Sequence, residues 1–173
     1  MKDPLIPEII PATARSVVRT RTREAAGRNP RRTLKDITVL VADDHAAIRL
    51  VMCKLLKEDG HIKVVGQAKD GQEAVKIARK LRPDVIIMDL AMPVLSGLEA
   101  TRQILGFNPA AKVLILSAYD DVQYVTHSVS LGALGFLSKS TDMGFLVEAI
   151  REVAKGNWFF SPAIAGRMAR IRK

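Results

Sequence analysis

The sequence predicts an α/β fold in which one parallel sheet lies between two layers of helices, a doubly wound architecture. The first observation is a regular alternation, from residue 37 onwards, of short apolar runs with segments of helical spacing. The second is that these runs are short and rich in β-branched residues, as buried parallel strands are. Short loops and right-handed crossovers then favour helices on both faces of the sheet.

The predicted elements form five strand–helix repeats. The apolar spacing between residues 48 and 56 predicts the first helix, Gly60 is its stop signal, and Pro83 ends the second helix. We expect strands at residues 37–42, 63–68, 84–88, 112–117 and 134–138. We expect helices at about residues 46–59, 71–82, 95–105, 121–131 and 142–155.

A last helix is predicted after these repeats. Ser161 can cap it and Pro162 suits its first position, so we expect it at residues 162–171. The aromatic run at residues 158–160 is expected to pack against this helix or against the edge of the sheet.

Charged residues close three of the predicted strands. Asp43 and Asp44 end the first, Asp89 ends the third, and Lys139 ends the fifth. Parallel strands all end at the same edge of their sheet, where open α/β sheets bind ligands. Three carboxylates and an ammonium at that edge predict a site for a divalent cation and a phosphoryl group.

Composition narrows the class of protein. The single cysteine, Cys53, cannot form an intramolecular disulfide, and no zinc-binding pattern is present, which favours a reducing cytosol. No run approaches the roughly 20 apolar residues that a membrane span needs. We therefore expect a cytoplasmic protein without a membrane partner.

The net charge of +9 is unevenly distributed. Residues 1–36 hold nine Lys/Arg and four Asp/Glu, a net of +5, and residues 167–173 add +4, so residues 37–166 are neutral. With four prolines and seven arginines, residues 1–35 are expected to be a basic, mobile arm. A solvated tail and a non-specific nucleic-acid contact both stay open for this arm.

Four separated motifs resemble the receiver domain of bacterial two-component response regulators. They are VLVADDH at residues 39–45, DLAMPVLSG at 89–97, LSA at 116–118 and GALGFLSK at 132–139. The Asp43-Asp44-His45 form and the ending at residues 155–162 are most similar to the LuxR/FixJ (NarL-like) subfamily. The resemblance implies a flavodoxin-like, five-stranded sheet of order 2-1-3-4-5, with a receiver domain at 36–157. Residues 158–173 are then a C-terminal extension, or the start of a linker to an absent output domain.

The resemblance also assigns roles to the charged residues. Asp89 is expected to accept the phosphoryl group. Asp43, Asp44, Asp89 and the backbone carbonyl of Ala91 are expected to hold Mg²⁺, with Mn²⁺ as an alternative. Lys139 is expected to neutralise phosphoryl oxygens. Without the resemblance, Asp43 and Asp44 could be strand-end and helix-cap residues, and Lys139 a solvated strand end.

Further residues are expected to sense or tune the phosphoryl group. Ser117 would donate to a phosphoryl oxygen, although its hydroxyl could instead satisfy a local backbone group. Phe136 is the expected aromatic switch, for which plain core packing is an equal alternative. Ala91 and Tyr119 occupy positions that tune phosphoryl lifetime in relatives. His45 is expected to be a loop or first-turn residue.

The predicted function is a Mg²⁺-dependent aspartyl-phosphorylation switch in a two-component phosphorelay. Its partners would be a sensor histidine kinase or a phosphotransfer protein, and a homodimer on phosphorylation. The alternative is the N-terminal fragment of a LuxR-type DNA-binding transcription regulator whose helix-turn-helix domain is missing. A phosphohydrolase is disfavoured, because such enzymes carry an acid where this chain has Ala91. We therefore expect no enzyme activity beyond slow self-dephosphorylation.

Overall fold

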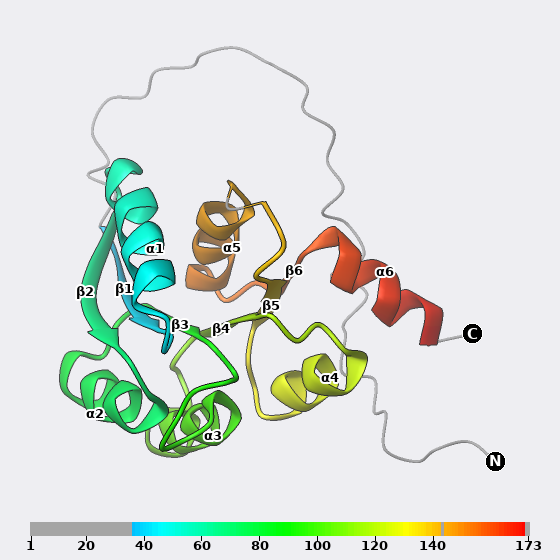
Figure 1. Cartoon of the computed structure of the whole chain (residues 1–173), viewed down its shortest axis with the longest axis horizontal. Coiled ribbons are helices and arrows are strands. Elements are labelled where there is room, and N and C mark those ends of the chain that lie inside the picture. Colours follow the sequence, from blue (N-terminus) through cyan, green and yellow to red (C-terminus); the bar gives the residue numbers. More distant parts are fainter. Residues whose placement is uncertain (1–35, 143, 172–173) are drawn as a thin grey trace, which may run out of the picture.

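The computed structural model describes residues 36–142 and 144–171 (Figure 1). The predicted basic arm therefore lies outside the described residues. The strands are β1 (Ile37–Ala42), β2 (Ile62–Ala68), β3 (Val85–Met88), β4 (Val113–Ser117), β5 (Gly135–Ser138) and β6 (Phe159–Phe160). The helices are α1 (Ala46–Glu58), α2 (Gly71–Leu81), α3 (Gly97–Phe107), α4 (Val122–Ser130), α5 (Gly144–Ala154) and α6 (Pro162–Ile171).

The strands form one parallel sheet of order β2-β1-β3-β4-β5-β6. The predicted α/β class and the order 2-1-3-4-5 are confirmed. The prediction of five strands is corrected by β6, which pairs Phe159 with Gly135 and Phe160 with Phe136 of β5. Two residues are too few to produce a periodicity, so this strand depends on its neighbour and could not be predicted from the sequence alone.

Helices cover both faces of the sheet (Figure 1). Alternate strand residues divide the core into two clusters, as the two-residue period of a strand requires. One cluster packs beneath α1 and α5 and includes Val41, Ile87 and Leu116. The other packs beneath α2, α3, α4 and α6 and includes Met88 and Phe136. The core is mostly aliphatic, and it fixes the strand ends that carry the candidate site.

The last helix is part of this fold. The hydrogen bond from the Ser161 amide to the Phe136 carbonyl, 3.3 Å long, continues the pairing of β5 with β6. Ile164 is completely buried in the core beneath α4 and α6. The Arg167 guanidinium contacts the Asp120 carboxylate at 2.7 Å and donates to the Asp120 carbonyl at 2.9 Å. Helix α6 is thus attached both to β5 and to the loop between β4 and α4.

Strand β2 carries an irregularity. Val39 of β1 pairs with Val64, but the next residue, Leu40, pairs with Gly66, so Val65 is an extra residue in the ladder. An extra residue of this kind is a β-bulge, which bends the strand and increases its local twist.

A close approach of backbones shapes the turn after β3. A Cβ atom added at Gly97 would lie 1.8 Å from the carbonyl oxygen of Asp89, so no larger residue fits there without a shift. The Gly97 amide donates to the Leu90 carbonyl at 2.9 Å. Helix α3 begins at Gly97 rather than at the predicted residue 95, because the Ser96 hydroxyl accepts from the Glu99 amide as an N-cap. The start of α3 therefore holds the segment that carries Asp89.

Candidate functional site

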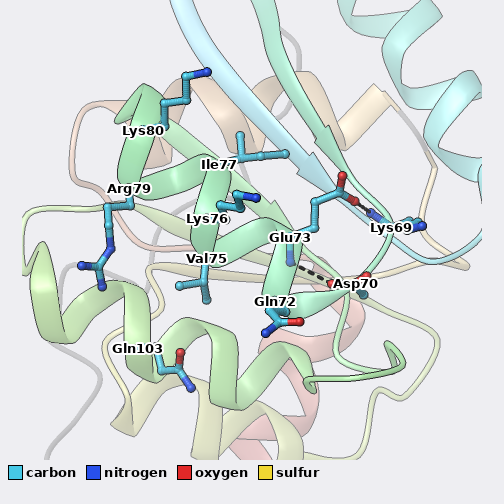
Figure 2. Close-up of a pocket in the computed structure, with 10 residues that line it drawn as sticks. All are labelled: Lys69, Asp70, Gln72, Glu73, Val75, Lys76, Ile77, Arg79, Lys80 and Gln103. Carbon is cyan, nitrogen blue, oxygen red and sulfur yellow. Dashed lines mark hydrogen bonds between the residues drawn. The ribbon is translucent and has the colours of Figure 1, made fainter.

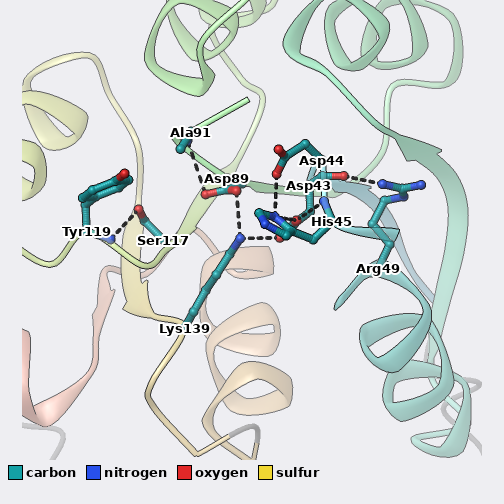
Figure 3. Close-up of polar contacts among 9 residues, drawn as sticks. All are labelled: Asp43, Asp44, His45, Arg49, Asp89, Ala91, Ser117, Tyr119 and Lys139. Carbon is teal, nitrogen blue, oxygen red and sulfur yellow. Dashed lines mark hydrogen bonds and ion pairs between the residues drawn. The ribbon is translucent and has the colours of Figure 1, made fainter. Parts of the chain in front are cut away.

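The charged residues predicted to meet at the carboxyl edge of the sheet do meet there. Figure 3 shows Asp43 and Asp44 after β1, Asp89 after β3 and Lys139 after β5, gathered around one point. Asp43 and Asp89 are buried, with 1% and 2% of their surface exposed, whereas Asp44 is partly exposed. The rule that parallel strands end at one edge therefore located these four residues correctly.

Lys139 links the two buried acids. Its ammonium lies 2.7 Å from Asp43 Oδ2 and 2.7 Å from Asp89 Oδ2. The contact with Asp89 has hydrogen-bond geometry, whereas the contact with Asp43 is an ion pair without it. The Lys139 amide donates to the Ser117 carbonyl at 2.8 Å, which anchors the lysine backbone to β4. Lys139 is thus a bridge that neutralises part of the buried negative charge.

Burial dominates the electrostatics of Asp89. Desolvation raises the pKa of Asp89 above its ordinary value, and the hydrogen bond and charge of Lys139 only partly offset this effect. The neighbouring Asp43 raises it further. Burial alone would lower the pKa of Lys139, but its close contacts with the negatively charged Asp43 and Asp89 raise it overall. The lysine therefore stays charged at neutral pH.

The turn between β1 and α1 is held by several contacts. The His45 amide donates to Asp43 Oδ1 at 2.8 Å. The His45 imidazole places Nδ1 2.6 Å from Asp44 Oδ1 and 3.4 Å from Asp43 Oδ1. The Arg49 guanidinium donates to the carbonyl oxygen of Asp43 at 2.6 Å. Sequence reasoning placed His45 correctly at the start of the helix but missed its contacts with the acids, and it missed Arg49 altogether.

The donor set fits a divalent cation. One ligand atom each from Asp43, Asp44, His45 and Asp89 lies within 4.8 Å of all the others. Asp43 Oδ2 and Asp44 Oδ1 are buried and have no contact of hydrogen-bond geometry with the residues that the structure describes, although Lys139 Nζ lies 2.7 Å and His45 Nδ1 2.6 Å from them, respectively. Carboxylate oxygens are the ligands that a hard cation such as Mg²⁺ prefers. The Ala91 amide lies 3.4 Å from Asp89 Oδ1, so the backbone at Ala91 borders the cluster, while its carbonyl as a ligand stays a prediction.

The side chains of the expected sensing residues form no hydrogen bond with the acids or with Lys139, although the Ser117 carbonyl accepts from the Lys139 amide. Ser117 is buried at the end of β4, and its hydroxyl accepts from the Tyr119 amide at 3.0 Å (Figure 3). This local bond is the alternative that the sequence left open for Ser117. Phe136 is completely buried in the core. Tyr119 is half exposed, and its ring centroid lies 5.7 Å from that of Tyr124. The roles of these residues toward a phosphoryl group stay predictions.

Val94 has an uncommon backbone conformation in the loop after Asp89. Its φ is +67°, in the left-handed region that β-branched residues rarely adopt, and 75% of its surface is exposed. Strained residues of this kind gather at functional sites and are held there by their surroundings. Nothing in the residue pattern signals this conformation, because the sequence shows only a proline followed by an ordinary apolar residue.

A hollow lies away from the acidic cluster of Asp43, Asp44, His45 and Asp89. It is an open groove of about 900 Å³ on the outer surface of α2, extending to Gln103 of α3 (Figure 2). Its charged side chains are Lys69, Asp70, Glu73, Lys76, Arg79 and Lys80. Glu73 and Asp70 take part in capping α2, since Glu73 accepts from the Lys69 amide and Asp70 accepts from the Glu73 amide. The groove contains no residue of the acidic cluster.

Comparison with known proteins identifies the family. The model of the response regulator receiver domain matches residues 39–151. The chain belongs to the response regulator receiver family. The predicted resemblance is thereby confirmed. None of the helices that the structure describes is long and apolar enough to cross a bilayer.

Curated relatives of this receiver domain are transcriptional and response regulators. The chain is 38% identical over 134 residues to the transcriptional regulatory protein DegU of Brevibacillus brevis, covering 78% of this chain and 57% of that protein. It is 39% identical over 133 residues to the response regulator GacA of Pseudomonas aeruginosa, covering 77% of this chain and 62% of that protein. The chain thus spans about three fifths of the length of these relatives.

Solved structures agree with the subfamily. A LuxR-family two-component response regulator from Aurantimonas sp. SI85-9A1 superposes with a TM-score of 0.77 and 33% identity, covering 80% of this chain and 99% of that one. The receiver domain of the putative response regulator NarL from Mycobacterium tuberculosis gives 0.69 and 32% identity, covering 71% of this chain and 99% of that one. The predicted LuxR/FixJ (NarL-like) type is therefore confirmed.

Proposed function

We propose that this receiver domain is a Mg²⁺-dependent switch that accepts a phosphoryl group on Asp89. The observation that carries the proposal is the meeting of Asp89 with Asp43, Asp44 and Lys139 at one edge of the sheet. The phosphoryl donor would be a phosphohistidine of a sensor kinase or a phosphotransfer protein. We place this activity in the cytoplasm.

The positions of these side chains support a direct transfer of the phosphoryl group to Asp89. An Asp89 carboxylate oxygen attacks the phosphorus, a new P–O bond forms, and the P–N bond to the donor imidazole breaks with its electron pair going to that nitrogen. Asp43, Asp44 and Asp89 would hold the Mg²⁺, which supplies charge neutralisation at the phosphoryl oxygens. Lys139, already in contact with Asp89 Oδ2, can turn its ammonium to a phosphoryl oxygen. Its charge is preserved by the raised pKa.

The output would pass through β4, β5 and the loop after β4. Ser117 must exchange its local bond with the Tyr119 amide for a phosphoryl oxygen, which would move the loop that follows. We propose that Phe136 responds to this movement, and that Ala91 and Tyr119 tune the lifetime of the phosphoryl group. Homodimer formation on phosphorylation is part of this proposal.

Phosphorylation with a small donor tests the site assignment. Incubation with acetyl phosphate and Mg²⁺ should add one phosphoryl group to the wild type, measured by intact mass, and none to Asp89→Asn. The matched control is Asp121→Asn, since Asp121 is exposed and its side chain makes no capping bond. Equal labelling of Asp89→Asn and the wild type would disprove the assignment, and loss of labelling in Asp121→Asn would show that the assay is not specific.

A second candidate function concerns a longer protein. The relatives include proteins named transcriptional regulators, and the chain spans only part of their length. We propose as the alternative that this chain is the receiver part of a DNA-binding LuxR-type regulator. The intact mass of the protein isolated from its natural source decides between the two. A mass equal to that of the 173 residues would exclude a longer regulator.

A further inference from the structure

Arg49 touches the metal-binding turn without touching a carboxylate of it. Its guanidinium donates to the carbonyl oxygen of Asp43 at 2.6 Å, a short bond of the charge-assisted kind. The Arg49 amide donates to the His45 carbonyl at 3.1 Å, so the arginine backbone belongs to the first turn of α1. No carboxylate lies within 4 Å of this guanidinium among residues 36–142 and 144–171. Its partner is therefore a peptide group rather than an acid.

That peptide group joins the two acids. The carbonyl of Asp43 and the amide of Asp44 form one planar unit, so a bond that fixes the oxygen also fixes the direction in which Asp44 continues. The rest of Asp43 is already held, because its amide donates to the Ala68 carbonyl at 3.1 Å and its Oδ1 accepts from the His45 amide at 2.8 Å. Arg49 adds the restraint on the side that leads to Asp44.

The two cations of the site approach the turn from opposite sides (Figure 3). Lys139 contacts carboxylate oxygens, which a metal or a phosphoryl group also needs. Among the described residues, the Arg49 guanidinium contacts the Asp43 carbonyl and no carboxylate, so it can keep its bond while ligands enter and leave. The two cations therefore have different functions.

We propose that Arg49 is a positioning residue for the divalent-cation site, acting through the peptide between Asp43 and Asp44. The proposal rests on the proposed function of this site. The direction of the change in Mg²⁺ affinity distinguishes positioning by Arg49 from a purely electrostatic role. A guanidinium repels a cation, so deleting its charge alone should tighten Mg²⁺ binding. Loss of positioning should instead weaken Mg²⁺ binding, because the metal-free protein would no longer hold the carboxylates in the geometry that binds the cation.

The test is Mg²⁺ affinity measured by titration calorimetry on the full chain. Arg49→Ala should weaken Mg²⁺ binding about tenfold, the size expected for one hydrogen bond to a charged donor. Arg49→Lys and Arg49→Gln, which can each donate one bond to the carbonyl, should recover part of this loss. The control is Lys54→Ala, which removes the same charge from an exposed position of α1 and should leave the affinity unchanged or slightly tighter.

A second readout separates positioning from general damage. With acetyl phosphate as donor, the Mg²⁺ concentration for half-maximal phosphorylation should rise about tenfold in Arg49→Ala, while the rate at saturating Mg²⁺ stays near that of the wild type. Unchanged or tighter Mg²⁺ binding in Arg49→Ala would overturn the proposal. If Mg²⁺-free thermal melts show that Arg49→Ala does not fold, the same measurements are made on Arg49→Gln, and unchanged or tighter Mg²⁺ binding there would overturn the proposal. If the wild type itself binds no Mg²⁺, the proposed function fails first, and Arg49 loses its role with it.

Discussion

At the scale of single residues, Lys139 already occupies the oxygens that a ligand would need. In the protein without metal it neutralises Asp43 and Asp89, which are both buried. Pairing of this kind adds little net stability compared with an apolar core, but removing one partner leaves buried charge uncompensated. Under the proposed function, Mg²⁺ would therefore weaken a contact that helps to hold Asp43 and Asp89 together.

Removing the Lys139 ammonium should change the stability of the protein and its response to beryllofluoride without weakening Mg²⁺ binding. Lys139→Ala should lower the Mg²⁺-free free energy of unfolding by about 1–3 kcal/mol, since two acids lose a charged partner that is itself partly open to water. Its Mg²⁺ affinity should be no weaker than that of the wild type, because no ligand is lost and a competitor is removed. Its beryllofluoride-induced shifts in NMR spectra should be lost. Urea titrations with and without Mg²⁺ measure the first two effects, with Lys155→Ala as the surface control. Normal shifts in Lys139→Ala would contradict the coupling role.

The raised pKa of Asp89 gives a prediction for pH. The folded protein holds the Asp89 proton to a higher pH than the unfolded chain, whose value is near 3.8. The favourable contribution of Asp89 to the free energy of unfolding is thus present at acid pH, and it is lost as the pH rises through the pKa of Asp89 in the folded protein. Without Mg²⁺, Asp89→Asn should therefore be more stable than the wild type at pH 7, and the difference should shrink toward pH 4. Urea unfolding across this range measures it. If the stability difference is constant with pH, or equals the difference between Asp121→Asn and the wild type, then ionisation of the buried Asp89 does not destabilise the fold.

The sequence predicted the residues of the site that end strands, and it missed those placed by the turn. Asp43, Asp44 and Lys139 follow from one rule about parallel strands, which needs no knowledge of side-chain conformation. His45 and Arg49 contact the acids only because the chain turns sharply between β1 and α1. The direction of side chains in a turn depends on backbone angles that residue patterns do not specify.

At the scale of elements, the predictions were most accurate where a signal was local. Helix α6 begins at Pro162 and ends at Ile171 as predicted, and the proline marks its start. The predicted cap by the Ser161 side chain is wrong, because its buried hydroxyl makes no hydrogen bond with the residues that the structure describes. Strand β6 exists only through its pairing with β5, so it has no local signal. The division between receiver domain and extension at residue 157 stays a prediction, although the segment after it packs on the sheet.

The attachment of α6 should depend on its buried residue more than on its ion pair. Ile164 is completely buried, so Ile164→Ala should cost about 2–4 kcal/mol through lost burial and a cavity. Arg167→Ala should have a much smaller effect, because its contact with Asp120 is at the surface and water screens it. Urea unfolding of both variants measures the difference. Equal losses would contradict the prediction, because they would mean that the ion pair contributes as much as the buried side chain.

At the scale of the whole molecule, the excess of positive charge is concentrated at the two ends of the chain. Residues 37–166 are neutral by count, and the excess of positive charge lies before and after them. The part that matches the receiver family model, residues 39–151, lies within this neutral stretch. Contact of that arm with nucleic acid stays a prediction, and counterion release would make such binding fall steeply with salt.

The two outer strands of the sheet have a consequence for how copies of this protein can meet. An unpaired outer strand offers free amides and carbonyls to which another chain can add, which is a common route to aggregation. On one side, β6 covers the first half of β5. On the other, the extra Val65 bends β2, and its Lys63 is exposed. Both features discourage continuous sheets between molecules, so a phosphorylation-dependent dimer would have to form through helices, whose surfaces can change while the sheet stays intact.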